Sequence, residues 1–210
     1  MADFEYYTKE GKSYERITRI LDYFQPPELV EWKLRVGKTE ANKVSKIALK
    51  FGSRVHELIE TNSACKKSDA DEVRNCMIAW NSWKANYVFK GMKIENGVTL
   101  YDEFRSIAGT PDFIYENRLI DIKTSREVKP IHFLQLGGYA SMMMKMPEQL
   151  AILRLDKSLG AYEYVLSDRI GMSVYDCINA FNHLFQFYRF YREVQSTLKP
   201  KGPMAQEEDV

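Results

Sequence analysis

The fold is decided by the stretch Gly109-Thr110-Pro111-Asp112-Phe113-Ile114-Tyr115 and by Leu119-Ile120-Asp121-Ile122-Lys123, which follows it closely. Both runs are rich in β-forming residues, and the polar Glu116-Asn117-Arg118 between them is typical of a turn, so the pattern predicts a β-hairpin. Side chains alternate along a strand, so Asp121 and Lys123 share one face. A hairpin centred between Glu116 and Asn117 sets Asp112 opposite Asp121, whereas a slip of one residue would send the two carboxylates to opposite faces.

These residue types suit the attack of water on a phosphodiester. Mg²⁺ needs only one or two carboxylates besides water and substrate phosphate, and it polarises the phosphoryl oxygen and generates or orients hydroxide. A lysine close to a ligand can orient the water or stabilise the anionic transition state. A Pro-Asp pair is by itself common in turns, and an Asp-x-Lys pair is common at a solvated edge. Asp121 and Lys123 lie inside an apolar run, however, where charge is costly unless it is paired or bound to metal.

A second group of candidates lies on a helix predicted from Glu40 to Asn62. Its apolar stripe consists of Val44, Ile47, Ala48, Phe51, Val55, Leu58 and Ile59. Gly52, His56 and Glu60 form a polar stripe on the adjacent flank. Gly52 leaves room for a strand or an ion one turn before His56, at a cost of about 1 kcal/mol relative to Ala. A histidine at such a boundary can be purely structural, but neutral imidazole is also a good ligand for Mn²⁺.

A third pair, Gln135 and Tyr139, lies four residues apart on a helix predicted to open at Pro130, so both side chains point to one side. Between them Gly137-Gly138 weakens the helix, which favours the close passage of another backbone or of a nucleic acid. The alternative is that Tyr139 and the methionines after it fill the core.

In their order along the chain, with the histidine helix first, the hairpin second and the Gln135–Tyr139 pair last, the three groups resemble the PD-(D/E)XK nuclease superfamily, and specifically its RecB-like exonuclease branch of phage or mobile-element type. The hairpin matches the motif that names the superfamily. Residues 52–60 are similar to the branch's histidine helix, and residues 135–139 match its Gln-x-x-x-Tyr motif. The resemblance spans about residues 13 to 166.

The resemblance implies a site that holds Mg²⁺ or Mn²⁺. Its implied metal ligands are His56, Asp112, Asp121 and the backbone carbonyl of Ile122. Its implied catalytic residues are Asp112, Asp121, Lys123, Gln135 and Tyr139, the last two positioning the substrate or the lysine. Glu60 and Glu95 are further candidates, either as supports of the site or as ligands of a second ion.

The expected fold is α/β, a three-layer α/β/α restriction-endonuclease-like core with a mixed central sheet and an N-terminal helical region. Helices are expected over Ser13–Phe24, Glu28–Val36, Glu40–Asn62, Asp71–Asn86, Pro130–Met146 and Ser173–Gln195. Strands are expected over Gly91–Asn96, Val98–Phe104, the two hairpin runs, Ala151–Asp156 and Tyr162–Ser167. We expect one nuclease domain over residues 1–198, with N-terminal helices in 13–86 and the catalytic sheet and helices in 91–196, and a disordered tail over 199–210.

Composition agrees with one cytoplasmic domain. The 210 residues are 45% hydrophobic, but no apolar run reaches the ~20 residues that span a bilayer. The N-terminus lacks the basic and apolar regions of an export signal, so no membrane association is expected. The chain has three cysteines, Cys65, Cys76 and Cys177, which fit reduced packing thiols. An iron–sulfur cluster of the kind some RecB-like nucleases carry needs four, so none is expected.

The net charge of +1 says little about nucleic acid, but one segment is locally basic. Its cations are Lys33, Arg35, Lys38, Lys43, Lys46, Lys50 and Arg54. They can form a basic wall that leads to the histidine helix, or simply a solvated helix face.

Two functions follow from the sequence. The first is a metal-dependent DNA exonuclease that acts on single- or double-stranded DNA at a free end, in recombination, repair or phage DNA processing. The second is a catalytically inactive nuclease-fold subunit that binds nucleic acid. The complete motif set favours activity. A small-phosphoester hydrolase is disfavoured because no loop of phosphate-cradling glycines is evident.

Overall fold

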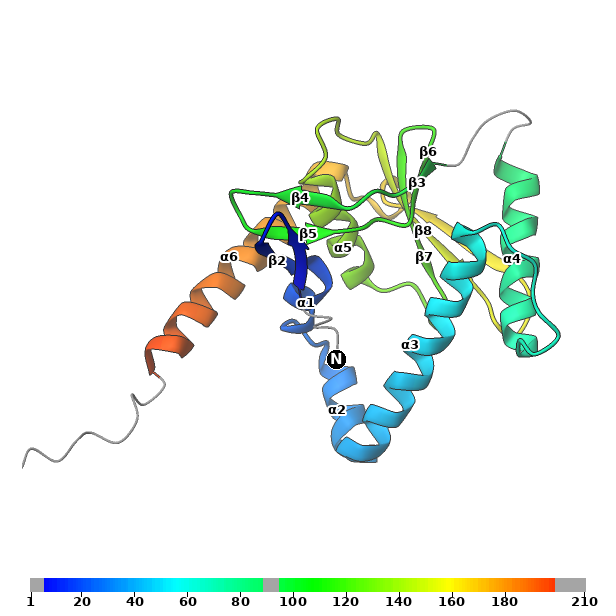
Figure 1. The fold of residues 1–210 in the computed structure, drawn as a ribbon, viewed down its shortest axis with the longest axis horizontal. Coiled ribbons are helices and arrows are strands. Elements are labelled where there is room, and N and C mark those ends of the chain that lie inside the picture. The colour runs from blue at the N-terminus through cyan, green and yellow to red at the C-terminus, as the bar shows by residue number, and fades with distance from the viewer. Residues whose placement is uncertain (1–5, 89–94, 199–210) are drawn as a thin grey trace, which may run out of the picture.

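The computed structural model describes residues 6–88 and 95–198, in which two mixed β-sheets and six α-helices form an α/β fold (Figure 1). The central sheet has the strand order β3-β6-β7-β8-β9. These strands are β3 (Glu95–Asn96), β6 (Phe113–Tyr115), β7 (Arg118–Lys123), β8 (Gln149–Leu155) and β9 (Tyr162–Leu166). β7 and β8 pair in parallel, and the other neighbours pair antiparallel.

The second sheet has the order β1-β2-β5-β4. Its strands are β1 (Tyr6–Lys9), β2 (Lys12–Arg16), β4 (Leu100–Asp102) and β5 (Ile107–Gly109). The helices are α1 (Ile17–Asp22), α2 (Pro27–Val36), α3 (Lys38–Glu60), α4 (Asp71–Tyr87), α5 (Pro130–Ala140) and α6 (Val174–Leu198), with a short 3-10 helix, η1 (Asp168–Ile170).

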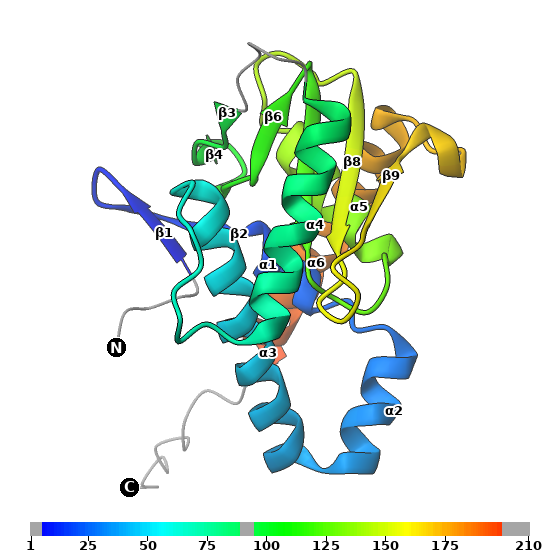
Figure 2. The ribbon, with the colours of Figure 1, turned by 90° about the vertical axis from the view of Figure 1, so that its right-hand side faces the viewer.

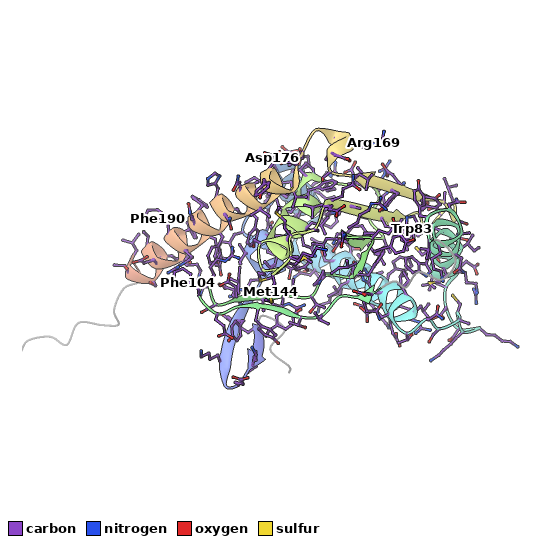
Figure 3. All side chains as sticks on the ribbon, turned by 90° about the horizontal axis from the view of Figure 1, so that it is seen from above. Trp83, Phe104, Met144, Arg169, Asp176 and Phe190 are labelled. Atoms are coloured by element: carbon purple, nitrogen blue, oxygen red, sulfur yellow. The ribbon has the colours of Figure 1, made fainter. Side chains whose placement is uncertain are left out.

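Successive side chains of β7 point to opposite faces of the central sheet and so belong to two separate halves of the core. Leu119 packs with Phe133 and Phe181 in the layer formed by α1, α5 and α6, whereas Ile120 packs with Val55 and Trp83 in the layer formed by α3 and α4. Figure 2 shows α4 lying across the front of the central sheet, and Figure 3 shows Trp83 on the side of α4 that faces the sheet. The predicted three-layer α/β/α core is confirmed.

The predicted hairpin is confirmed together with its register. Phe113 pairs with Ile120 and Tyr115 with Arg118, so the hairpin is centred between Glu116 and Asn117. Both of these turn residues have positive φ, 50° and 59°, as a two-residue type I′ turn requires. The sequence pattern therefore set the faces of β6 and β7 correctly.

The helix predicted over 13–24 is wrong in its first part. Residues 12–16 form β2, in which Tyr14 points inward, packs edge-on against Tyr101 and hydrogen-bonds Glu103. The β1–β2 hairpin turns at Glu10-Gly11, where both φ angles are positive, and only after Arg16 does the chain enter α1. The N-terminal region is thus strand and helix rather than helix alone.

The strand predicted over 98–104 is shorter, and it belongs to the second sheet. β4 ends at Asp102, whose carboxylate accepts the backbone N–H of Arg105 and so closes a turn. The chain then returns as β5, a strand that was not predicted. The division into a helical part and a catalytic part is not sharp, because β5 pairs with β2.

α5 ends at Ala140, six residues before the predicted end at Met146. Its two glycines explain why it lies where it does: a Cβ on Gly137 would come within 2.2 Å of the carbonyl oxygen of Cys177 on α6. The predicted close passage of another backbone is confirmed, and the backbone is that of α6. Of the predicted strand over 91–96, only Glu95–Asn96 falls in the described residues, and the tail over 199–210 lies outside them. Among the helices of the described ranges, none combines the length and the apolar character that crossing a bilayer requires.

Candidate active site

Asp112 lies immediately before β6, and the hairpin brings it to β7. Its Oδ2 accepts the backbone N–H of Ile122 at 2.5 Å. When the register of the hairpin is continued, Ile122 faces Pro111, which has no N–H to donate. The N–H and the C=O of a strand residue point to the same edge. The carbonyl of Ile122 is therefore directed to the Asp112 edge of β7, opposite a residue that cannot donate to it.

His56 reaches the same carboxylate from α3. Its Nδ1 lies 2.9 Å from Asp112 Oδ1. Burial by itself lowers the pKa of His56, but the hydrogen bond and charge of Asp112, together with the charge of Asp121, outweigh it and raise the pKa above its ordinary value. Both oxygens of Asp112 are thus engaged, one by the imidazole and one by the strand.

Asp121 is buried on β7 with 2% of its surface exposed. Its Oδ2 lies 2.6 Å from Lys123 Nζ in an ion pair. Burial raises the pKa of Asp121, the Asp112 carboxylate raises it further, and Lys123 and His56 oppose the shift. The carboxylate therefore sits where negative charge is costly and cations are favoured.

Gln135 on α5 holds this ion pair in place. Its Oε1 accepts from Lys123 Nζ at 2.9 Å, and its Nε2 donates to Asp121 Oδ1 at 3.2 Å and to the Tyr139 hydroxyl at 2.8 Å. Tyr139 is itself buried, and burial and the charge of Asp121 raise its pKa. The sequence prediction that Gln135 and Tyr139 share one side of α5 is confirmed by these contacts.

A cleft of about 350 Å³ opens beside His56, Asp112 and Ile122. Glu60 also lines it, one helical turn after His56. Glu95 is exposed on β3, pairs with Ile114 and does not line the cleft. The structure therefore brings Glu60 to the candidate site and leaves Glu95 outside it.

Gly52 was expected to leave room for a strand or an ion. A Cβ at this position would lie 3.6 Å from Thr124 Oγ1, an ordinary van der Waals contact. The end of β7 does approach α3 here, but not so closely that it excludes a side chain. The space that Gly52 leaves belongs to a shallow trough along α3 that also includes Leu49, Ser53 and His56.

Among the described residues, no three His, Cys, Asp or Glu side chains are arranged to hold an ion together. His56 instead contacts Asp112, and Asp121 turns to Lys123. The donor set still fits a hard divalent ion, since it offers two carboxylates and an imidazole nitrogen. The fit is supported by the Ile122 carbonyl, which is directed toward Pro111, a residue without an N–H to donate to it. The predicted metal site stays a prediction.

The cleft also contains residues to which the sequence analysis gave no role at the site: Asn62, Trp80, Lys84 and Asn96. Lys84 Nζ lies 5.4 Å from the centre of the Trp80 ring, and Asn96 donates to the backbone carbonyl of Glu60 at 3.2 Å. Lys84 could have been singled out as a cation one turn after Trp80 on the apolar face of α4. Asn62 and Asn96 carry no signal of their own, because only the fold places them beside His56.

Comparison with known proteins adds distant similarities. No protein family model matches the chain, and no curated protein matches it. Among solved structures, the chain is similar to a phage-related exonuclease from Haemophilus somnus 129PT, at 14% identity over 89% of this chain and 96% of that one, with a TM-score of 0.41. It is also similar to a protein named SSO0001, at 17% identity over 76% of this chain and 69% of that one, with a TM-score of 0.37. Similarity this distant assigns neither a family nor an activity, and the function has to be argued from the site itself.

Proposed function

We propose that the protein is a divalent-metal-dependent deoxyribonuclease, an exonuclease that hydrolyses phosphodiester bonds from a free DNA end in recombination, repair or phage DNA processing. The observation that carries the proposal is the network in which Asp121 and Lys123 of β7 form an ion pair and Gln135 of α5 accepts a hydrogen bond from Lys123. Ile122, whose backbone N–H donates to Asp112, lies between Asp121 and Lys123 on β7. A buried carboxylate and a held ammonium beside a second carboxylate and an imidazole are a charge arrangement suited to phosphodiester hydrolysis.

His56, Asp112, Asp121 and the Ile122 carbonyl would hold Mg²⁺ or Mn²⁺. When bound, the ion would supply Lewis-acid polarisation of a phosphoryl oxygen and a water of lowered pKa. The rest of the chemistry belongs to the chain's own side chains. Gln135 fixes Lys123 Nζ through its Oε1, so the ammonium is already oriented before substrate arrives.

The Lys123 ammonium carries the charge-stabilising role. Negative charge accumulates on the phosphate oxygens as water attacks, and a positioned cation stabilises the transition state more than the ground state. Tyr139 contributes indirectly, because its hydroxyl accepts from Gln135 Nε2 and thereby helps to fix the orientation of that amide. Lys123 is thus the group proposed to act on the phosphate, and Gln135 and Tyr139 position it.

The alternative function, an inactive nuclease-fold subunit that binds nucleic acid, has the same fold and the same surface. A direct experiment separates the two. Purified protein is incubated with end-labelled linear single- and double-stranded DNA, and with circular DNA, in Mg²⁺, in Mn²⁺ and in excess chelator. An exonuclease shortens the linear molecules progressively, requires the metal and spares the circles. Cleavage of circles would indicate an endonuclease, and binding without cleavage in every metal would favour the inactive subunit.

The variant Asp121→Asn serves as the matched control in that experiment. It keeps the size of the buried side chain while removing its charge, so the protein should fold and lose metal-dependent cleavage. Cleavage that persists in Asp121→Asn would point to a contaminating nuclease.

A further inference from the structure

The helical hairpin formed by α2 and the first half of α3 buries very little of itself. α2 has no buried residue, and between Lys38 and Arg54 only Ala41 of α3 is buried. Figures 1 and 2 both show this hairpin projecting beyond the two sheets. Leu34, Ile47 and Leu49 are 79%, 62% and 72% exposed, so its apolar side chains do not find a core. Burial in the domain therefore does not explain why the hairpin carries these residues.

The α3 arm of the hairpin is strongly basic. On α2, Lys33 and Arg35 are balanced by Glu28 and Glu31, but between positions 38 and 50 of α3 the cations are Lys38, Lys43, Lys46 and Lys50, and Glu40 is the acidic residue. Lys43 lies 3.9 Å from Glu40, at the outer limit of an ion pair. Within the described residues no carboxylate forms an ion pair with Lys46 or Lys50. The uncompensated positive charge attracts a polyanion.

The cations are arranged along α3 in a row that leads to the candidate site. Lys46, Leu49, Lys50 and Ser53 are spaced i, i+3, i+4 and i+7, so they share one face of the helix. Leu49 and Ser53 line the shallow trough that continues to His56. From Lys43 to His56 the distance along the helix axis is about 20 Å, at 1.5 Å per residue.

The end of the trough near His56 contains two carboxylates, Glu57 and Glu60, but it repels an anion less strongly than two free carboxylates would. Glu57 accepts a hydrogen bond from Arg54 at 2.9 Å, and Arg54 also holds Asp69 through two contacts of 2.9 Å. Glu60 is the other carboxylate at that end, and it adjoins the residues that would hold the metal. A negatively charged strand can therefore follow the lysines up to His56.

We infer that Lys43, Lys46 and Lys50 form a track for single-stranded nucleic acid, which runs along α3 and delivers the strand to His56 and Asp112. The inference rests on the proposed function, because the track ends at the proposed metal site. A single strand is the occupant that fits, since the trough is lined by one helix and its exposed Leu49 offers an apolar surface to unstacked bases. The phosphates follow the row of lysines.

The test compares Lys43→Gln/Lys46→Gln/Lys50→Gln with Lys145→Gln/Arg169→Gln/Arg189→Gln. The second set changes the net charge equally, at exposed positions that follow or lie on α5, η1 and α6. Binding of a fluorescein-labelled single strand of about 12 nucleotides, within the range of single-strand site sizes, is measured by anisotropy without metal. Because the readout is binding, it does not depend on cleavage.

The track variant should bind about tenfold or more weakly at low salt. The slope of log K against log salt should fall by about 2, at ~0.7 for each neutralised phosphate over three lysines. The control variant should match the wild type in both, and circular dichroism should show all three proteins folded. An unchanged slope in the track variant overturns the track, as does equal loss in the control. Equal binding of blunt duplex overturns the single-strand assignment, and equal binding of a polyglutamate peptide shows a site for acidic protein instead.

Hydrolysis of bis(p-nitrophenyl) phosphate separates failure of the track from failure of the proposed function. This small diester reaches the site but cannot span ~20 Å to Lys43, so the track variant should hydrolyse it at the wild-type rate while it loses activity on long single strands. Wild-type protein that cleaves neither substrate contradicts the nuclease, and the binding arm still decides the track. Loss on the small diester as well would mean that the lysine changes had disturbed the site, and would also overturn the track.

Discussion

Gly109 lies against the ring of Tyr139 so closely that a Cβ at this position would come within 2.4 Å of Tyr139 Cε1. This glycine is buried in β5, and Tyr139 is buried in α5. The contact joins the second sheet to the helix that holds Gln135, and through Gln135 to Lys123. The first residue of the Gly109-Thr110-Pro111-Asp112 motif therefore acts by making space for the last residue of the Gln-x-x-x-Tyr motif.

Gly109→Ala should destabilise the protein and lower its activity together. The added methyl forces the Tyr139 ring to move within a packed core, which costs about 1–3 kcal/mol. The displaced hydroxyl also loosens Gln135 and thus Lys123. Thermal and urea unfolding measure the first effect, and kcat on DNA measures the second.

Gly52→Ala is the matched control, because its Cβ would make only an ordinary 3.6 Å contact with Thr124. In the interior of α3 it should raise stability by up to about 1 kcal/mol. If the two alanine variants unfold at the same urea concentration, the tight packing of Gly109 is not what makes that position a glycine.

Gln135→Leu should reduce kcat on DNA by about tenfold to a hundredfold, with a much smaller change in KM. The leucine fills similar space but leaves Lys123 without its 2.9 Å acceptor, so the ammonium is no longer preoriented. Tyr139→Phe, which removes only the hydroxyl bonded to Gln135, should give a smaller loss in the same direction. Steady-state kinetics on a labelled single strand check both variants. A larger loss of kcat in Tyr139→Phe than in Gln135→Leu would contradict the proposal that Tyr139 acts through Gln135.

The catalytic hairpin could be read from the sequence because its determinants are local. Glu116-Asn117 sets the turn, the turn sets the register, and the register sets the faces of Asp112 and Asp121. Helical spacing likewise placed His56 and Glu60 on one flank of α3, where both line the cleft.

The β1–β2 hairpin carries a local signal in its sequence. A glycine at the second of two turn residues, Glu10-Gly11, between runs that contain tyrosines is typical of a tight hairpin. The partner of β2 could not be read in this way, since Glu15 pairs with Ile107, which is distant in the chain. Long-range pairing of this kind depends on the packing of the whole domain.

The internal geometry of the site was also beyond the sequence. Strand alternation put Asp121 and Lys123 on one face, but nothing local indicates that His56 of α3 contacts Asp112, because only the packing of α3 on the sheet brings them together. Nor does any motif place Lys84 of α4 in the same cleft as His56 of α3.

His132 should make the protein less stable in mild acid. It is buried, its Nδ1 accepts the backbone N–H of Lys129 at 3.1 Å, and burial together with Lys123 and Lys129 lowers its pKa to about 3. The unfolded chain binds a proton at this residue below a pH of about 6.5, whereas the folded chain does not. The contribution of neutral His132 to the free energy of unfolding is therefore fully present above a pH of about 6.5. It is lost as the pH falls toward 3, by up to about 1.4 kcal/mol per pH unit.

Urea unfolding between neutral pH and mild acid checks this prediction against His132→Asn. The variant should be less stable at neutral pH because packing is lost, but its stability should fall less steeply as the pH is lowered. Parallel curves for the two proteins would show that His132 does not carry the pH dependence.

Glu60→Gln and Glu95→Gln should behave differently. Glu60 lines the cleft beside His56 and Asp112, so removal of its charge should raise the metal concentration needed for half-maximal cleavage. Glu95 is exposed outside that cleft, and its variant should titrate with Mg²⁺ and Mn²⁺ like the wild type. Metal titrations of cleavage compare the three proteins. A shift in the Glu95 variant alone would place the supporting carboxylate on β3 instead of α3.

Lys123→Ala separates the enzyme from the inactive binding subunit. The side chain is only partly buried, with 20% of it exposed, and its loss leaves the Asp121 carboxylate without its 2.6 Å partner. Stability should therefore fall modestly, and Lys123→Ala/Asp121→Asn should recover part of it by removing the unpaired charge. Cleavage by the single variant should fall by roughly 10²–10³-fold, the scale for one preorganised transition-state donor. Affinity for DNA should change far less, because phosphate contacts are shared by many cations. Kinetics and anisotropy on the same labelled strand provide the comparison, and undiminished cleavage in Lys123→Ala would exclude the proposed mechanism.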